Sequence, residues 1–234
     1  MKQYRSIFTL LARSVVYKLM AILFGTAALH TAVFFLLGNQ RSFEKLYDHW
    51  GTRVVFGVGL VMTTALLIST LSQSGSKLDY TIRRLRIGNR SLCLCQSVFN
   101  AGCFLIFWAV EILVALLLCR LWMSSREVAS HQAVYLAFYR SDLLHSLLPL
   151  DDVSRWVRNF VVFLCLGICS ACAPVLQRRG EQHWGVLALP VVLAFVFPGG
   201  IAKRAYDALY GTLGVISAFA LIVNAWGEEF QNED

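Results

Sequence analysis

The chain has 234 residues, of which 57% are hydrophobic and only 15% are charged, whereas an average soluble domain is about 25% charged. Its apolar residues come in long, nearly uncharged blocks of the length needed to cross a bilayer, so composition argues against a soluble globular domain. The net charge of +7 does not indicate nucleic-acid binding, because the basic residues flank the apolar blocks and no recognition fold is visible. They are expected to set the topology and to contact the headgroups of membrane lipids.

The apolar blocks predict an all-α, polytopic membrane helix bundle that forms a single transmembrane domain. Six spans are predicted, with five spans and a re-entrant segment as the alternative, because Pro190 and Pro198-Gly199-Gly200 interrupt the short fifth block. The predicted spans cover residues 19–37, 54–71, 98–121, 160–176, 186–201 and 208–226.

The residues before the first span alternate between apolar and basic faces. Ile7, Leu11 and Val15 recur at helical spacing, while Arg5 and Arg13 lie on other faces. This pattern predicts either an N-terminal helix lying in the membrane interface or an extension of the first span.

The segment between the second and third spans has the pattern of a short, basic, amphipathic helix over residues 77–90. Ser76 and Asp79 have capping-box spacing, and Gly88-Asn89 is typical of a helix end. Two interpretations remain open, a loop that merely sets topology and a helix on which a cytoplasmic partner docks. The apolar face is formed by Leu78, Ile82 and Leu85, and the basic face by Arg83, Arg86 and Arg90.

Two ionisable residues fall inside predicted spans, His30 in the first and Glu111 in the third. A charge inside a bilayer is costly, so each residue is a functional hypothesis. Their similar depths would let them pair across helices. The alternative is that a protonated Glu111 and a neutral His30 are satisfied separately by neighbouring groups.

The exterior segment 122–158 is too apolar for a solvated loop. Val134–Tyr139 and Leu143–Leu148 predict short helices that rest on the outer surface and stop at Pro149. The adjacent Asp151 and Asp152 are expected to cap the next helix rather than share a metal ion.

All seven cysteines lie in or beside apolar blocks, so no disulfide framework is implied. Cys165, Cys169 and Cys172 share one face of the fourth span. Packing surface is the preferred interpretation of this face, and a soft-metal site is not predicted. Two pairs of small residues suit close helix contact, within the bundle or across a dimer; they are Ala21 with Gly25 and Gly167 with Ala171.

The density of Lys and Arg predicts the orientation of the chain. The leader and the Lys77–Arg90 segment are compact and basic, whereas the basic residues of the opposite side are spread over the long 122–158 segment. The protein is therefore expected in the cell membrane with both termini cytoplasmic.

Motifs of common enzyme classes are missing from the sequence. It contains no Gly-x-x-x-x-Gly-Lys-Ser/Thr phosphate loop, no His-Glu-x-x-His zinc helix and no Gly-x-Ser-x-Gly elbow. We expect neither an enzyme nor a cofactor in this chain.

Three segments resemble the membrane subunit (permease) of a type-2 ATP-binding-cassette exporter of the short Gram-positive bacterial type. They are Leu10–Leu19, Tyr80–Leu85 and Ala137–Leu150. One departure is that such permeases usually place their exterior helices between the last two spans, whereas the long exterior segment here follows the third. The resemblance implies export by a dimer of permeases, with ATP and Mg²⁺ held by a separate cytoplasmic ATPase subunit. That subunit would dock on a coupling helix, and the docking residues would be Leu78, Tyr80, Ile82, Arg83, Arg84, Leu85 and Arg86.

Three functions therefore remain open for this sequence. The first is the permease subunit, working with a second copy or a paralogue. The second is a non-transporting assembly or regulatory subunit, which explains the topology equally well. The third is an intramembrane enzyme using His30 and Glu111.

Overall fold

A computed structural model describes residues 2–37, 42–72, 89–126, 131–150, 152–178, 188–189, 192–193, 197 and 204–227. These residues are all-α and contain no strand, as predicted. Among the described residues, five helices are long and apolar enough to cross a membrane, so the chain is a polytopic membrane protein. They are α1 (Lys2–Leu37), α3 (Trp50–Ser72), α5 (Asn89–Arg126), α8 (Val153–Arg178) and α10 (Arg204–Gly227).

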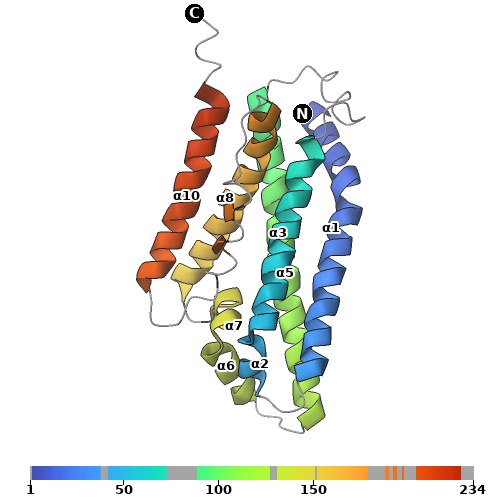
Figure 1. The fold of residues 1–234 in the computed structure, drawn as a ribbon, viewed down its shortest axis with the longest axis vertical. Helices are drawn as coiled ribbons and strands as arrows, with labels where there is room; N and C mark the ends of the chain where they lie inside the picture. The colour runs from blue at the N-terminus through green and yellow to red at the C-terminus, as the bar shows by residue number, and fades with distance from the viewer. Residues whose placement is uncertain are drawn as a thin grey trace, which may run out of the picture.

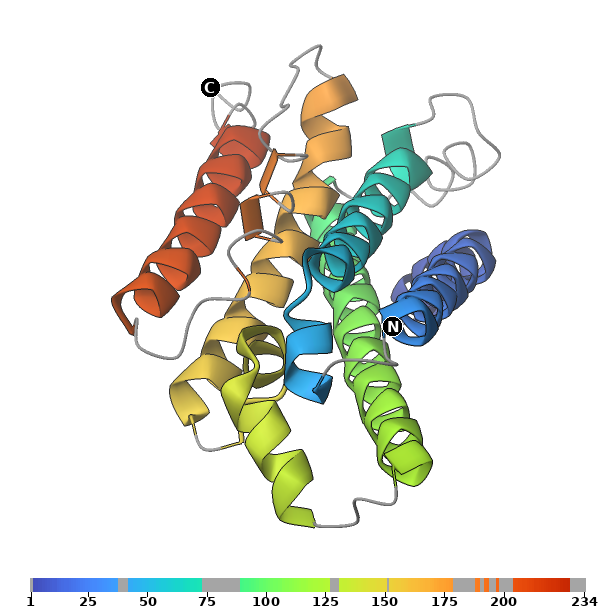
Figure 2. The same ribbon diagram turned by 60° about the horizontal axis from the view of Figure 1, so that its bottom comes forward.

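The five long helices run side by side along the long axis of the molecule (Figures 1 and 2). Helix α5 packs on α8 and α1, α3 packs on α1 and α8, and α10 packs on α8. Three short helices, α2 (Phe43–Tyr47), α6 (His131–Arg140) and α7 (Asp142–Leu147), gather at one end. The described ends of α1 and α10 nearest the termini lie at the opposite end, together with the ends of α3 and α5 that flank residues 73–88.

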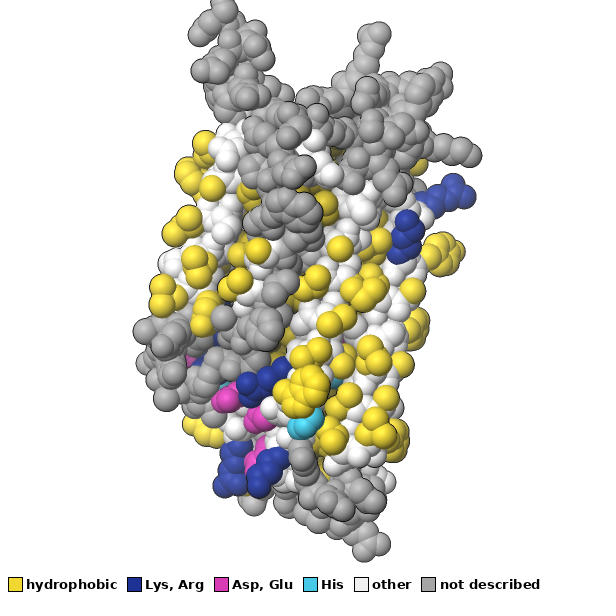
Figure 3. All heavy atoms as spheres, viewed as in Figure 1, with side chains coloured by type: hydrophobic (Ala, Val, Ile, Leu, Met, Phe, Trp, Pro, Cys, Tyr) yellow, Lys and Arg dark blue, Asp and Glu magenta, His cyan; other side chains and the backbone are white. Residues whose placement is uncertain are grey.

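The surface of the bundle matches a bilayer environment. On the face shown in Figure 3, described charged side chains gather near the two ends, and the middle is covered by hydrophobic and uncharged groups. Large apolar side chains of the long helices, such as Phe24, Leu117 and Phe219, are exposed, as expected where lipid tails cover them.

Five of the six predicted spans lie within described helices, and these helices are longer than the apolar blocks. The predicted third span, 98–121, lies inside α5, which begins at Asn89 and ends at Arg126. An apolar block ends at the first polar residues. The helix does not end there, because its backbone hydrogen bonds can continue into the membrane interface.

The N-terminal segment is an extension of the first span and not a separate interfacial helix. Helix α1 is continuous over 36 residues. Its apolar stripe is nevertheless genuine, since Ile7 and Leu11 are buried against Leu92, Cys95 and Phe99 of α5. A neighbouring helix, rather than lipid, therefore covers the amphipathic face.

The predicted coupling helix lies almost wholly outside the described residues. Residues 77–88, including every predicted docking residue, are not described. The end proposed at Gly88-Asn89 is wrong in one respect, because Asn89 and Arg90 form the first turn of α5.

The fifth predicted span, 186–201, is described at a few residues only. Leu189 packs against the buried cluster that contains Cys165 and Cys169, whereas Phe197 contacts the rings of Phe56 and Phe163. Helix α8 ends at one end of the bundle and α10 begins at the other (Figure 1). The choice between a sixth span and a re-entrant segment lies outside the described residues.

Helix α7 is buried, so the prediction that it rests on the outer surface is wrong. Its residues 143–147 are all buried, and groups at both of its ends have hydrogen-bond partners in neighbouring elements, as a buried helix end requires. The carboxylate of Asp48 accepts hydrogen bonds from the Ser141 hydroxyl at 3.0 Å and the Leu143 amide at 3.3 Å. At the other end, the Trp108 indole donates to the Leu147 carbonyl at 3.0 Å.

Candidate functional site

The structure brings His30 and Glu111 together. Helix α1 packs on α5, and the His30 Nε2 atom lies 3.0 Å from the Glu111 Oε2 atom, with 3% and 4% of the two side chains exposed. Of the two arrangements open from the sequence, the paired one is found.

The pair is close but incompletely satisfied. Neither ring nitrogen of His30 has a hydrogen-bond partner among the described residues. The two groups therefore lie within ion-pair distance without a hydrogen bond between them. Since isolated charges inside a bilayer are costly, each group is the main compensation for the other.

Helix α2 closes the pair from the end of the bundle that carries the short helices. The Tyr47 ring is stacked on the His30 ring, with centroids 6.5 Å apart and an interplanar angle of 12°. Burial, with a smaller contribution from the negative charge of Glu111, raises the pKa of Tyr47 well above its usual value. The phenol is therefore neutral at any physiological pH.

The arrangement brings together one imidazole and one carboxylate from different helices, which are two potential ligands only. The described residues contain no group of three or more His, Cys, Asp or Glu side chains that could hold a metal ion.

The remaining predicted features are placed as follows. Cys165 and Cys169 are buried against Ala218 of α10, which fits a packing role. The Asp152 carboxylate caps α8 by accepting a hydrogen bond from the Ser154 amide at 3.1 Å. Cys172 is also buried, with its sulfur 3.6 Å from that of Cys93.

Tyr47 was missed by sequence reasoning, because α2 is too short to give a periodic signal. The available signal was local: the spacing of Phe43, Leu46 and Tyr47 places three apolar side chains on one face, and all three are buried. An interhelical hydrogen bond from the Asn100 amide to the Ser170 hydroxyl, at 2.9 Å, was missed as well.

Two arginines counted with the exterior segment are in fact inside the bundle. Arg155 and Arg158 are 2% and 6% exposed. Arg155 lies 3.7 Å from the Asp152 carboxylate, and Arg158 donates to the Asn159 side chain and lies over the Phe197 ring. Helix α8 begins at Val153, so these side chains belong to its first turns and not to a solvated loop.

The fold and the buried pair define the class of this protein as a polytopic α-helical membrane protein with an ionisable pair inside the bundle. No family model, no curated protein and no solved structure matches the chain.

Proposed function

We propose that this chain is the permease subunit of an ATP-binding-cassette transporter. Its spans would move a substrate across the membrane, and export is the direction implied by the resemblance. The energy would come from separate cytoplasmic ATPase subunits, which would hold ATP and Mg²⁺. A second copy or a paralogue would complete the translocation unit.

One structural observation supports this proposal above the others. The described ends of α3 and α5 that flank residues 73–88 lie at the same end of the bundle as the described ends of α1 and α10 nearest the termini (Figure 1). The three short helices occupy the opposite end. A basic segment placed at the cytoplasmic end is available to a cytoplasmic partner, whereas one at the outer end would not be.

Coupling to an ATPase requires a segment that receives the movement and a helix that transmits it into the bundle. Residues 73–88 connect the end of α3 to the start of α5 along the chain, so a force on them would act on both helices. Helix α5 in turn carries Glu111, which contacts His30 of α1. A displacement of the segment between α3 and α5 would therefore move α5 and change the contact between Glu111 and His30.

The proposal predicts that reversing the charges of the docking segment will break partner binding. The triple variant Arg83→Glu/Arg84→Glu/Arg86→Glu should lose copurification with an ATPase in a mild-detergent pull-down from the native host, with partners identified by mass. Membrane insertion should be unchanged, because the apolar spans are intact.

The matched control reverses three arginines of the opposite side, Arg41, Arg126 and Arg140, and should copurify normally. If the Arg83/Arg84/Arg86 variant keeps its ATPase, the docking role is refuted. If the unaltered chain brings down other membrane proteins but no ATPase, an assembly or regulatory subunit becomes the better description. The departure of the exterior segment from the usual permease layout favours that second candidate.

A further inference from the structure

Two cysteines from different helices meet where α5 and α8 pack together. The sulfur of Cys93 lies 3.6 Å from that of Cys172, and both thiols are free. Cys93 lies in the second turn of α5 and Cys172 in the last two turns of α8, so the contact is at the end of the bundle where α5 begins (Figure 1). Together with Ala171, Leu176 and Ala225 of α10, they form one buried cluster.

The backbones of α5 and α8 stay close beside this contact. A Cβ atom at Gly167 would lie 2.7 Å from the Ala101 Cα atom, within about two helical turns of the two sulfurs. The Asn100 to Ser170 hydrogen bond, at 2.9 Å, lies between these two contacts. A disulfide requires Cα atoms about 4.4–6.8 Å apart, which closely packed helices provide. Sulfur atoms that already touch then need only side-chain rotation to reach the bonded distance of about 2.05 Å.

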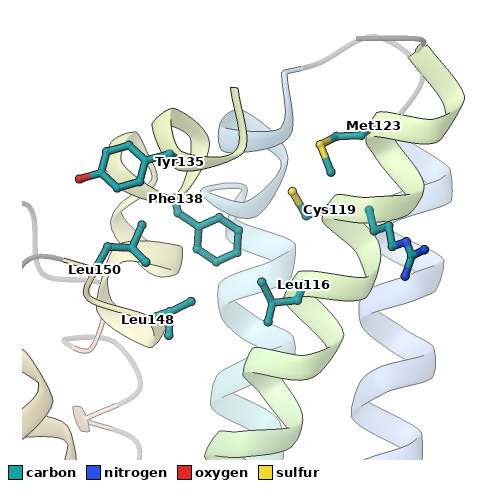
Figure 4. A pocket seen from close by; sticks show the side chains of 8 residues that line it. Leu116, Cys119, Met123, Tyr135, Phe138, Leu148 and Leu150 are labelled. Carbon is teal, nitrogen blue, oxygen red and sulfur yellow. The ribbon is translucent and has the colours of Figure 1, made fainter. Parts of the chain in front are cut away.

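Other cysteines are less well placed to form a disulfide. Cys165, Cys169 and Cys172 follow one another on α8 at spacings of four and three residues, which puts their Cβ atoms about 5–6 Å apart. A disulfide needs Cβ atoms roughly 3.5–4.5 Å apart. Figure 4 shows Cys119 at a hollow between α5 and the short helices, and the described lining residues of this hollow include no second cysteine.

We propose that Cys93 and Cys172 form a reversible disulfide when the membrane is exposed to peroxide, and that this bond locks the start of α5 to the end of α8. Hydrogen peroxide is small and uncharged, so it can enter an apolar helix interface that excludes ionic oxidants. It oxidises one thiol to a sulfenic acid: an S–O bond forms, the O–O bond breaks, and one water leaves with the thiol proton. The second thiol attacks that sulfur, so an S–S bond forms, the S–O bond breaks and a second water leaves. The two sulfurs are oxidised and the two peroxide oxygens are reduced.

The contact between the sulfurs determines the product of this oxidation. A sulfenic acid that meets no thiol is open to further, irreversible oxidation, whereas one beside a thiol condenses to a disulfide. Small cellular thiols then restore the two cysteines by thiol–disulfide exchange. Disulfides of reducing compartments are usually transient in this way and serve as redox sensors.

The test uses the full chain in membranes, with a protease site inserted after residue 128, which lies between the two cysteines in the sequence. After treatment with hydrogen peroxide, the protein is solubilised in mild detergent, cleaved, and denatured with N-ethylmaleimide to block the remaining thiols. On a non-reducing gel the two fragments should stay joined, and dithiothreitol should separate them. Without cleavage, the treated chain should carry two fewer maleimides than the untreated chain.

Single cysteine variants identify the bond. Cys93→Ser and Cys172→Ser should each abolish the joined product. Cys95→Ser and Cys169→Ser are the matched controls on the same two helices, and both should keep it. Fragments of the unaltered chain that separate without reductant, at peroxide concentrations that oxidise the half-buried Cys95, would overturn the proposal. Joined fragments in Cys93→Ser would overturn it as well.

The unfolding temperature in detergent measures the lock. The bond would join residues 79 positions apart in the sequence, so it restricts the unfolded chain and should raise the unfolding temperature of the peroxide-treated protein. Dithiothreitol should return this temperature to that of the untreated protein, and Cys172→Ser should show no rise. A cross-linked protein with an unchanged or lower unfolding temperature would show that the folded helices do not accommodate the bond, and would overturn the lock.

Discussion

At the scale of single residues, the contact between His30 and Glu111 is the most consequential in the bundle. The two side chains are buried, 3.0 Å apart, on different helices. Removing one member leaves the other without its main compensating charge. Removing both members leaves a mismatch of volume but no unpaired charge.

This asymmetry predicts a strong coupling in a double-mutant cycle. His30→Leu should destabilise the protein by roughly 3 kcal/mol, and His30→Leu/Glu111→Leu should cost less than His30→Leu alone. Denaturant-induced unfolding in detergent measures the four free energies. Costs that simply add would show that the two groups are satisfied separately.

At the scale of elements, the close contact between α5 and α8 depends on a glycine, Gly167, which has no side chain. A Cβ atom at Gly167 would come within 2.6 Å of the Ala101 amide nitrogen and 2.7 Å of its Cα atom. These are backbone atoms, which cannot rotate away. The Asn100 to Ser170 hydrogen bond crosses the same interface at 2.9 Å, and it requires the two helices to stay this close.

The prediction at this scale compares two glycine substitutions. Gly167→Ala should destabilise the protein by about 1–3 kcal/mol, because the added methyl group overpacks the α5–α8 contact. Gly25→Ala is the control with the same gain in helix propensity, and a Cβ atom there would meet nothing within 4 Å. Gly25→Ala should therefore be neutral or slightly stabilising in the same unfolding assay. Equal effects at the two sites would contradict the close approach at Gly167.

At the scale of the whole molecule, the order in which the helices cross the bundle determines which loops share a side. Helix α8 ends and α10 begins at opposite ends (Figure 1). The described ends of α1 and α10 nearest the termini lie at the same end of the bundle, and the distribution of Lys and Arg predicts that both termini are cytoplasmic.

Reporter fusions should check this topology directly. Reporters inserted after residues 75 and 180 should be on the cytoplasmic side, and those after residues 128 and 202 on the opposite side. The pair at 180 and 202 is decisive for the fifth span. If both report the same side, that segment re-enters the membrane without crossing it.

The sequence by itself determined the class, the spans and the ionisable candidates. Transfer of an apolar segment into hydrocarbon is a local property that sums along consecutive residues, so hydropathy places α1, α3, α5, α8 and α10 without knowledge of the fold. The cost of a charge in lipid is local too, which is why His30 and Glu111 were conspicuous.

Only the tertiary structure decided what these elements contact. The pairing of His30 with Glu111, the burial of α7 by Asp48 and Trp108, and the cover that Tyr47 provides all join segments far apart in the chain. Such contacts depend on which helices become neighbours and on the rotation of each helix about its axis. Neither quantity is encoded in local periodicity, because a stripe such as Ile7 and Leu11 suits lipid and a helix partner equally well.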